Sequence, residues 1–341
     1  MSTTTPESGG ETARRKLSYS LLELASIREG DSVGQTLANS VAYARHSEEL
    51  GFNRFWLAEH HNMEGISSSA TSVLIGHIAG ATKTLRVGSG GIMLPNHPPL
   101  VIAEQFGTLE SLYPGRIDLG LGRAPGTDLL TSRALRREHL GEEQFPEDVA
   151  LLKALLGPLQ PGQRIKAIPG ADTNVPIWLL GSSLYSAQLA AQMGLPYAFA
   201  GHFSPRYYRE ALRLYRDQFQ PSDTLEAPYS ILSLPAIPAD TDEEAEFLAT
   251  TCYQRVLSLF RRQPLWIRPP VTSMDEIWSS DEQVAVMDFL SLQLRGSAET
   301  VSQQLDQVLS TVDVDELMFT VDIYDPEKRR HALDILASIL S

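Results

Sequence analysis

Phe55-Trp-Leu-Ala-Glu-His-His-Asn62 is the stretch of sequence that decides the fold of this chain. Its first four residues are apolar and form a buried strand pattern that runs directly into Glu59, His60 and His61. Titratable side chains directly after a buried strand are typical of parallel α/β proteins, whose catalytic residues gather beyond the carboxyl ends of the strands. Adjacent residues of a strand point to opposite sides, so at most one histidine enters the site. His60 is the first catalytic candidate; in the alternative interpretation one histidine is packed and the other solvated.

Strand and helix patterns alternate along the chain on both sides of this stretch. Apolar runs bounded by Gly, Pro or polar residues predict eight strands, at 17–22, 52–58, 85–94, 116–122, 177–180, 197–200, 229–237 and 316–321. Helical periodicity follows them at about 36–50, 68–82, 102–113, 147–156, 184–193, 208–219, from 242 onward, 298–309 and 326–340. Eight repeats of strand and helix predict an α/β fold of the (β/α)₈ TIM barrel type.

One segment departs from the alternation of strands and helices. Residues 261–290 carry Pro264, Pro269 and Pro270 with three bulky aromatics, and they predict an insertion between strand seven and strand eight that helps to close the pocket. We expect residues 17–341 to form a single domain and residues 1–16, polar and without a signal-peptide core, to be a disordered tail. The rival fold is a doubly wound sheet, which requires G-x-G-x-x-G after an early strand; neither Gly88-Ser-Gly90 nor Gly120-Leu-Gly122 completes that motif.

Composition limits the partners. The formal net charge of −14 opposes binding to nucleic acid or to an anionic membrane, and a small organic molecule is the expected partner. Cys252 is the only cysteine, so an internal disulfide or a cysteine zinc site is excluded, and a reducing, cytoplasmic location is expected. We interpret Cys252 as part of a buried helix stripe. No run of about 18 apolar residues predicts a membrane span.

Three further strand ends carry unusual residues. Glycines at Gly88, Gly90 and Gly91 indicate either a barrel corner or a close approach of backbone to a flat ligand. Arg123 follows Gly122 at the end of the fourth strand, where it binds a phosphate or forms a structural salt bridge.

The third of these strand ends is the start of a helix. Ser182 and Ser183 follow Gly181, and exposed amides with two hydroxyls there favour an anion site, although plain N-capping is the alternative. Arg123 and the two serines together predict a phosphate held between the fourth and fifth strands. The usual barrel phosphate site, after strands seven and eight, is disfavoured because Asp240, Asp322 and Asp325 would repel an anion there.

Other chemistries are less well supported. The chain has no H-E-x-x-H and no G-x-S-x-G motif. A metal-dependent hydrolase could use His60, His97 and His202 from three strand ends, but the first strand offers no metal-binding pair. We therefore predict no metal site.

Four motifs in this order resemble the bacterial luciferase-like flavin monooxygenases, and in particular their single-chain subgroup. The motifs are Trp56-Leu-Ala-Glu-His-His, Arg86-Val-Gly-Ser-Gly-Gly-Ile-Met-Leu-Pro, Gly115-Arg-Ile-Asp-Leu-Gly-Leu-Gly-Arg-Ala-Pro-Gly and Trp178-Leu-Leu-Gly-Ser-Ser. The resemblance covers nearly all of residues 17–341. It implies that His60 is the catalytic histidine and that Gly90-Gly91 forms a cis peptide against the flavin ring. The residues that it implies to bind the cofactor FMN are Gly90, Gly91, Gly122, Arg123, Leu180, Gly181, Ser182, Ser183 and Ser186.

The resemblance also implies a reaction. FMN, reduced by a separate NAD(P)H:flavin reductase, would react with O₂ to form a C4a-peroxyflavin that oxygenates a small organic substrate, while His60 handles protons near neutral pH. A homodimer through the helices after the second and third strands is expected. An F420-dependent oxidoreductase and a non-catalytic flavin-binding protein are the alternatives. The luciferases carry a cysteine where this chain has Gly122 and an acidic residue where it has Ser182, so light emission is not implied. Roles in secondary metabolism and in housekeeping oxidation stay open.

Overall fold

The computed structural model describes residues 17–124, 129–135 and 142–341. Residues 1–16, expected to be a disordered tail, and Pro125 to Asp128, which follow Arg123 and Ala124, lie outside the described residues. No helix in the described part is long and apolar enough to cross a membrane.

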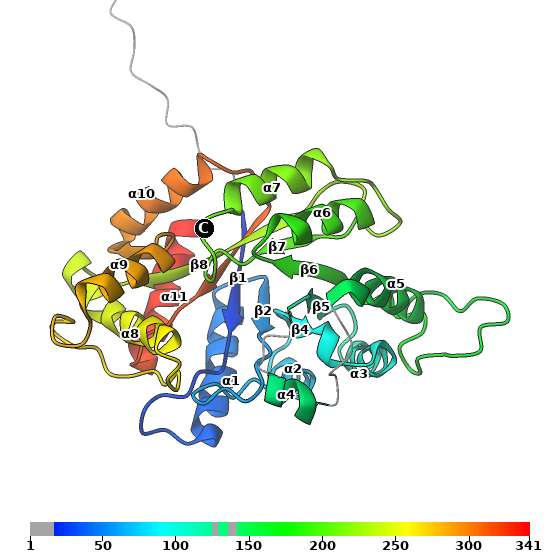
Figure 1. Ribbon diagram of the computed structural model, residues 1–341, viewed down its shortest axis with the longest axis horizontal. Coiled ribbons are helices and arrows are strands. Elements are labelled where there is room, and N and C mark those ends of the chain that lie inside the picture. Colours follow the sequence, from blue (N-terminus) through cyan, green and yellow to red (C-terminus); the bar gives the residue numbers. More distant parts are fainter. Residues whose placement is uncertain (1–16, 125–128, 136–141) are drawn as a thin grey trace, which may run out of the picture.

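Eight parallel strands close into a barrel (Figure 1). The last strand pairs with both the first and the seventh, which completes the ring. The predicted (β/α)₈ TIM barrel is confirmed, and the strands begin and end within two residues of the predicted positions except where the third is interrupted. The barrel strands are β1 (Ser18–Glu23), β2 (Arg54–Leu57), β3 (Arg86–Ser89), β5 (Ile117–Gly122), β6 (Ile177–Gly181), β7 (Tyr197–Phe199), β8 (Ser230–Pro238) and β10 (Glu316–Thr320).

Helices connect the strands on the outside of the barrel. Several are capped as their sequences predict: Ser32 and Gln35 form a capping box at α1, Gly194 ends α6 in the left-handed conformation, and Asp325 caps α11. The helices α6 and α11 have the predicted bounds. The helices found at the predicted positions are α1 (Val33–Glu49), α2 (Thr71–Ala81), α3 (Pro99–Leu112), α5 (Phe145–Leu156), α6 (Leu184–Met193), α7 (Tyr208–Asp217), α8 (Asp242–Phe260), α10 (Ala298–Leu309) and α11 (Pro326–Leu340).

Some short elements were not predicted. The third strand pattern, 85–94, divides into β3 and β4 (Ile92–Met93) at Gly90 and Gly91. The other additions are η1 (Leu94–Asn96), α4 (Leu129–Ala134), η2 (Glu142–Gln144), α9 (Ser280–Phe289) and β9 (Leu294–Gly296). β9 pairs with the end of β8, where that strand extends past β10.

The insertion between β8 and β10 is confirmed and lies at the carboxyl end of the barrel. It contains α9, and its first part is hydrogen bonded to the loops that follow β1 and β2: Leu265 donates to the Glu64 carbonyl over 2.8 Å and Ile267 donates to the Ile27 carbonyl over 2.9 Å. In Figure 1, α8, α9, α10 and α11 gather on one side of the barrel, away from α3 and α5.

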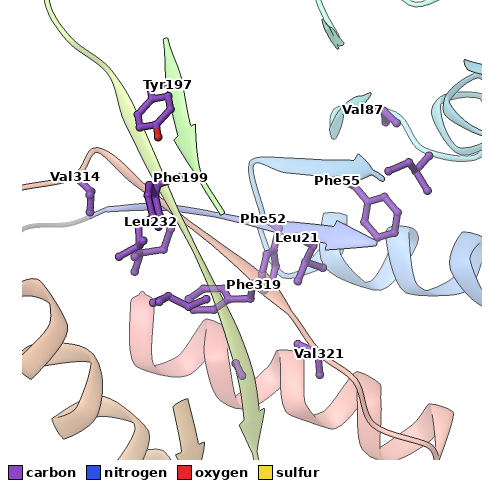
Figure 2. Packing of buried hydrophobic residues seen from close by; sticks show 14 of the residues in the cluster. Leu21, Phe52, Phe55, Val87, Tyr197, Phe199, Leu232, Val314, Phe319 and Val321 are labelled. Atoms are coloured by element: carbon purple, nitrogen blue, oxygen red, sulfur yellow. The ribbon is translucent and has the colours of Figure 1, made fainter. Parts of the chain in front are cut away.

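Alternate residues of each strand pack on opposite sides of the barrel wall. The outward residues, such as Phe55, Phe199 and Phe319, pack under the helices (Figure 2). The inward residues form a separate cluster that contains Leu22, Trp56, Ala58, Trp178, Ala198, Ile231 and Met318. The lone Cys252 is buried, as predicted.

Buried charges close the amino end of the barrel. Arg54 lies 2.8 Å from Asp118 and 3.0 Å from Glu316, and the Trp56 indole donates to Asp118 over 3.1 Å. Although burial favours the protonated acid, Arg54 and Arg86 hold the pKa of Asp118 below its ordinary value. These charges are paired with one another and hold the amino ends of β2, β3, β5 and β10 together.

Candidate active site

His60 lies beyond the carboxyl end of β2, on the inward side. The alternation that turns Trp56 and Ala58 into the barrel also turns His60 inward, whereas its neighbours Glu59 and His61 turn away. The Nδ1 atom of His60 is buried and has no hydrogen-bond partner among the described residues. A buried polar atom without a partner is rare in folded proteins, and at a strand end of a barrel it indicates a ligand.

The surroundings of His60 keep its ring neutral. Burial and the positive charge of Arg255 lower its pKa to about 4, against a smaller opposing effect of Glu59. The expectation that His60 handles protons near neutral pH stays a prediction, and the low pKa specifies that in the ligand-free protein it would do so from the neutral form. At pH 7 a neutral imidazole can accept a proton and cannot supply one.

Glu59 joins two segments of the rim through hydrogen bonds. One of its carboxylate oxygens accepts hydrogen bonds from His61 Nε2 and His97 Nε2, both over 2.8 Å, and the other accepts from the Met93 amide over 3.4 Å. These bonds, with the charges of His97 and His61, lower the pKa of Glu59 despite its burial. The buried carboxylate thus links the end of β2 to the loop after β4.

The trio of His60, His97 and His202, considered above as a less well supported alternative, does not form a metal-binding group among the described residues. Among the described residues, the one group whose ligand atoms lie close enough to hold an ion, within 4.8 Å of one another, is Glu59, His61 and His97. Its two imidazole–carboxylate distances of 2.8 Å are ordinary hydrogen-bond distances. Hydrogen bonds therefore account for this group.

Glycines form one wall of the site. The Gly90–Gly91 peptide is cis, as the resemblance implied. A Cβ atom on Gly90 would lie 2.5 Å from Leu22, and one on Gly91 would lie 2.7 Å from the Gly120 carbonyl oxygen. In contrast, a Cβ atom on Gly122 would meet its nearest neighbour, the Ile92 carbonyl oxygen, only at 3.8 Å. The backbone is therefore tightly packed at Gly90 and Gly91 and has open space beside Gly122, which suits a flat ligand.

Arg123 and the first turn of α6 come together at the next strand ends. β5 and β6 pair with Gly122 opposite Leu180, and the Arg123 guanidinium lies 4.3 Å above the ring of Tyr185 in α6. Sequence reasoning missed Tyr185, which is exposed and has no motif to mark it. The arrangement places a cation at a helix N-terminus, where an anion is stabilised.

The serines at this corner are not used as a helix cap. Ser183 occupies the N-cap position of α6, but its side chain makes no capping bond. Ser186 donates to the Ser183 carbonyl over 3.0 Å and packs directly against Gly181, where a Cβ atom would collide with its hydroxyl. The capping alternative is therefore wrong for Ser183, and the amides of the first turn stay available to a ligand.

The opposite half of the rim carries polar residues that the motifs did not indicate. His202, after β7, accepts from or donates to Ser233 of β8 over 2.8 Å, and burial lowers its pKa to about 4. Arg255 of α8 is ion paired with Asp322, which follows β10. Arg255 could not be predicted because it lies in the interior of an amphipathic helix, far along the chain from every strand end.

Comparison with known proteins identifies the family. Residues 18–313 match the model of a protein family that is described as luciferase-like monooxygenase. The chain belongs to the luciferase-like monooxygenase family. It is 51% identical over 327 residues to the protein YvbT of Bacillus subtilis (96% of this chain, 97% of the relative), and 49% identical over 326 residues to the luciferase-like monooxygenase of Escherichia coli K12 (95% and 97%). The enzyme is thus a luciferase-like monooxygenase.

Solved structures of luciferase-like proteins share the barrel. Apo-MsnO8 superposes with a TM-score of 0.85 at 33% identity, covering 95% of this chain and 98% of that one. The FMN complex of the oxygenating constituent of 3,6-diketocamphane monooxygenase of Pseudomonas putida has a TM-score of 0.72 at 18% identity (95% and 97% covered). The F420-dependent tetrahydromethanopterin reductase of Methanopyrus kandleri has a TM-score of 0.64 at 13% identity (95% and 98% covered). The last two likenesses show the fold alone.

Proposed function

We propose that the protein binds reduced FMN at the carboxyl rim of the barrel and uses O₂ to oxygenate a small organic substrate. The observation that carries this proposal is the convergence at one rim of three features: the glycine wall at Gly90 and Gly91, the cationic corner at Arg123, and the unpartnered His60. The bound flavin supplies the oxygen chemistry, through a C4a-peroxyflavin. The protein supplies binding, orientation and exclusion of water.

Each part of the rim has a defined task in this proposal. Arg123 and the amides and hydroxyls of Ser182 and Ser183, with Ser186 behind them, bind the FMN phosphate. Leu180 and Gly181 are the last two residues of β6 and directly precede the two serines. Gly90 and Gly91 support the flavin ring, which extends into the space beside Gly122. His60 is the catalytic residue: its neutral ring accepts a hydrogen bond or a proton from the reacting groups.

Water is excluded by the surrounding loops. The insertion at 261–290 is hydrogen bonded to the loops after β1 and β2, directly beside the entrance that the site requires. We infer that it closes the pocket over the bound reactants as part of one domain, 17–341. A separate NAD(P)H:flavin reductase supplies the reduced FMN.

The first experiment is an anaerobic titration with reduced FMN and, separately, with reduced F420, followed by mixing with oxygenated buffer. Tight binding of reduced FMN and a long-lived flavin absorbance after mixing are expected. Preference for F420 with no consumption of O₂ would make the protein a hydride-transfer enzyme. FMN binding with immediate oxidation and no change in any supplied substrate would make it a flavin-binding protein.

The expected homodimer uses α2 and α3. Val73 and Leu112 on these helices are large apolar side chains that are 68% and 62% exposed. Val73→Glu should convert the dimer to a monomer in analytical ultracentrifugation, whereas Val284→Glu, at a residue of α9 that is 70% exposed, should not. A wild-type monomer, or a dimer that survives Val73→Glu, would contradict this assembly.

A further inference from the structure

Four charges of alternating sign form a row in the order Glu23, Arg329, Asp322, Arg255; Glu23 and Arg255 are buried, and Arg329 and Asp322 are partly buried. Arg329 Nη2 lies 2.5 Å from Glu23, and Arg255 is ion paired with Asp322. Burial opposes the charge of Arg329, but Glu23 and Asp322 together hold its pKa above the ordinary value. The row is therefore electrically balanced as a whole, and its two ends are a carboxylate and a guanidinium.

The carboxylate of Glu23, at the negative end of the row, has its hydrogen-bond and ion-pair partners within the protein. Besides Arg329, Glu23 accepts hydrogen bonds from the Ala25 amide over 2.9 Å and from the Ser40 hydroxyl over 3.1 Å. Arg329 in turn donates to the Val321 carbonyl over 2.8 Å and lies 4.0 Å above the ring of Tyr43. This end is a structural element that fixes β1 and β10 to α1 and α11.

The guanidinium of Arg255, at the positive end of the row, has fewer partners within the protein. Arg255 is 9% exposed and carries five N–H donors, yet its one hydrogen bond within the described residues runs from Nη1 to Asp322. Its other nitrogens are not among the fully buried atoms that lack a partner, so a ligand that enters from solvent can reach them. The preferred partner of a guanidinium is a carboxylate, which matches the two parallel donors of the planar fork.

The position of Arg255 indicates where such a partner would lie. Its partner Asp322 follows β10 at the carboxyl rim, and the positive charge of Arg255 contributes to the low pKa of both His60 and His202. It stands on α8, across the rim from the corner formed by Arg123 and α6. A molecule held by Arg255 would extend toward His60.

We propose that Arg255 binds a carboxylate of the organic substrate, so that this enzyme selects carboxylate-bearing substrates. This substrate class rests on the proposed function. The substrate carboxylate would bind to Arg255 at the positive end of the row and so continue the alternation of charges. Arg255 would then lie between this carboxylate and Asp322 and would offset their mutual repulsion. His202, held by Ser233, supplies a neutral polar neighbour. A neutral substrate would not form this charge-assisted pair with Arg255.

The test compares acids with amides of equal shape. The probes are hexanoate, octanoate and 3-(methylthio)propanoate, each against its amide, measured by calorimetry with and without FMN. Wild-type protein should bind at least one acid about tenfold or more tightly than its amide. Arg255→Met should remove that preference, and Arg268→Met, a half-buried arginine of the insertion, should keep it. Equal affinity for acid and amide, no binding of any acid, or a preference that survives Arg255→Met would overturn the proposal.

Two further variants control for folding. Arg255→Met leaves Asp322 buried without its partner, which can destabilise the protein. The double variant Arg255→Met/Asp322→Asn removes both charges and should also lose the preference for acids, while Arg255→Lys keeps the charge and should retain part of it. Flavin binding is measured separately. An acid preference without FMN binding refutes the proposed monooxygenase and leaves the carboxylate site standing; FMN binding without the preference does the reverse.

Discussion

His60 illustrates at the residue scale how position changes chemistry. Its place after an apolar strand could be recognised from the sequence, but its protonation state could not, because it depends on burial and on Arg255, nearly two hundred positions along the chain. The same holds for Gly122, whose sequence neighbours do not show whether its missing side chain leaves a filled or an open space.

Replacing His60 by Asn should separate binding from chemistry. We expect reduced FMN to bind with an unchanged dissociation constant, because the phosphate corner and glycine wall are untouched, and oxygenation to fall by about 10²–10⁴. Stopped-flow mixing with O₂, using a substrate found by screening, measures both. Full-rate oxygenation by this variant would remove His60 from the mechanism.

Two glycine variants should behave differently. Among the described residues other than its chain neighbours, a methyl group on Gly122 meets no atom closer than 3.8 Å, so Gly122→Ala should keep the wild-type melting temperature and weaken FMN binding by occupying the space proposed for the ring. Gly91→Ala should instead lower the melting temperature, because its Cβ would lie 2.7 Å from the Gly120 carbonyl oxygen. Thermal melts with and without FMN distinguish the two. Unchanged FMN affinity of Gly122→Ala would place the flavin elsewhere.

At the scale of elements, local signals predicted those helices and strands that local interactions determine. The helix α6 ends at a glycine in the left-handed conformation and α11 begins at an aspartate cap followed by Pro326, both readable from sequence. The helix α9 was not predicted, although Ser279 and Glu282 form a capping box that can be recognised in the sequence. The prolines before it led to the prediction of an irregular insertion instead. The break between β3 and β4 follows from the contacts of Gly90 with β1 and β2, which no local pattern contains.

The link between the end of β2 and the loop after β4 depends on one carboxylate. Glu59→Gln removes the buried charge and replaces one of its two acceptor oxygens by a donating amide group, so the free energy of unfolding should fall by about 1–3 kcal/mol. Urea unfolding at pH 7 measures this. The matched control is Glu64→Gln, in the same connection but exposed, which should change stability by less than about 0.5 kcal/mol. Equal effects of the two variants would refute the structural role of Glu59.

At the scale of the whole molecule, folding places two buried neutral histidines at one rim. Burial lowers the pKa of His60 and of His202 from 6.5 to about 4, so between these pH values the unfolded chain binds more protons than the folded protein. Stability therefore rises with pH across this window and is lost as the pH falls from about 6.5 toward 4.

The ligand-free protein should accordingly lose up to about 3 kcal/mol of unfolding free energy per buried histidine between pH 6.5 and pH 4. His202→Gln should flatten this dependence, whereas His77→Gln, at an exposed position of α2, should leave it unchanged. Urea unfolding at half-unit pH steps provides the measurement. A dependence of the same steepness in His202→Gln would show that His202 does not titrate as its burial requires.

The amino-acid sequence by itself determined the barrel, since apolar runs and helical periodicity record which face of each element is buried, and eight repeats of strand and helix admit few ways of closing. It also determined the candidates at strand ends, because polar residues after a buried strand must emerge at the rim. Only the tertiary structure decided the partners of those residues: Tyr185 beneath Arg123, His97 on Glu59, and Arg255 on Asp322. The physical reason is that hydrogen bonds, ion pairs and burial depend on distances in space, and ring closure brings together residues that no sequence spacing relates.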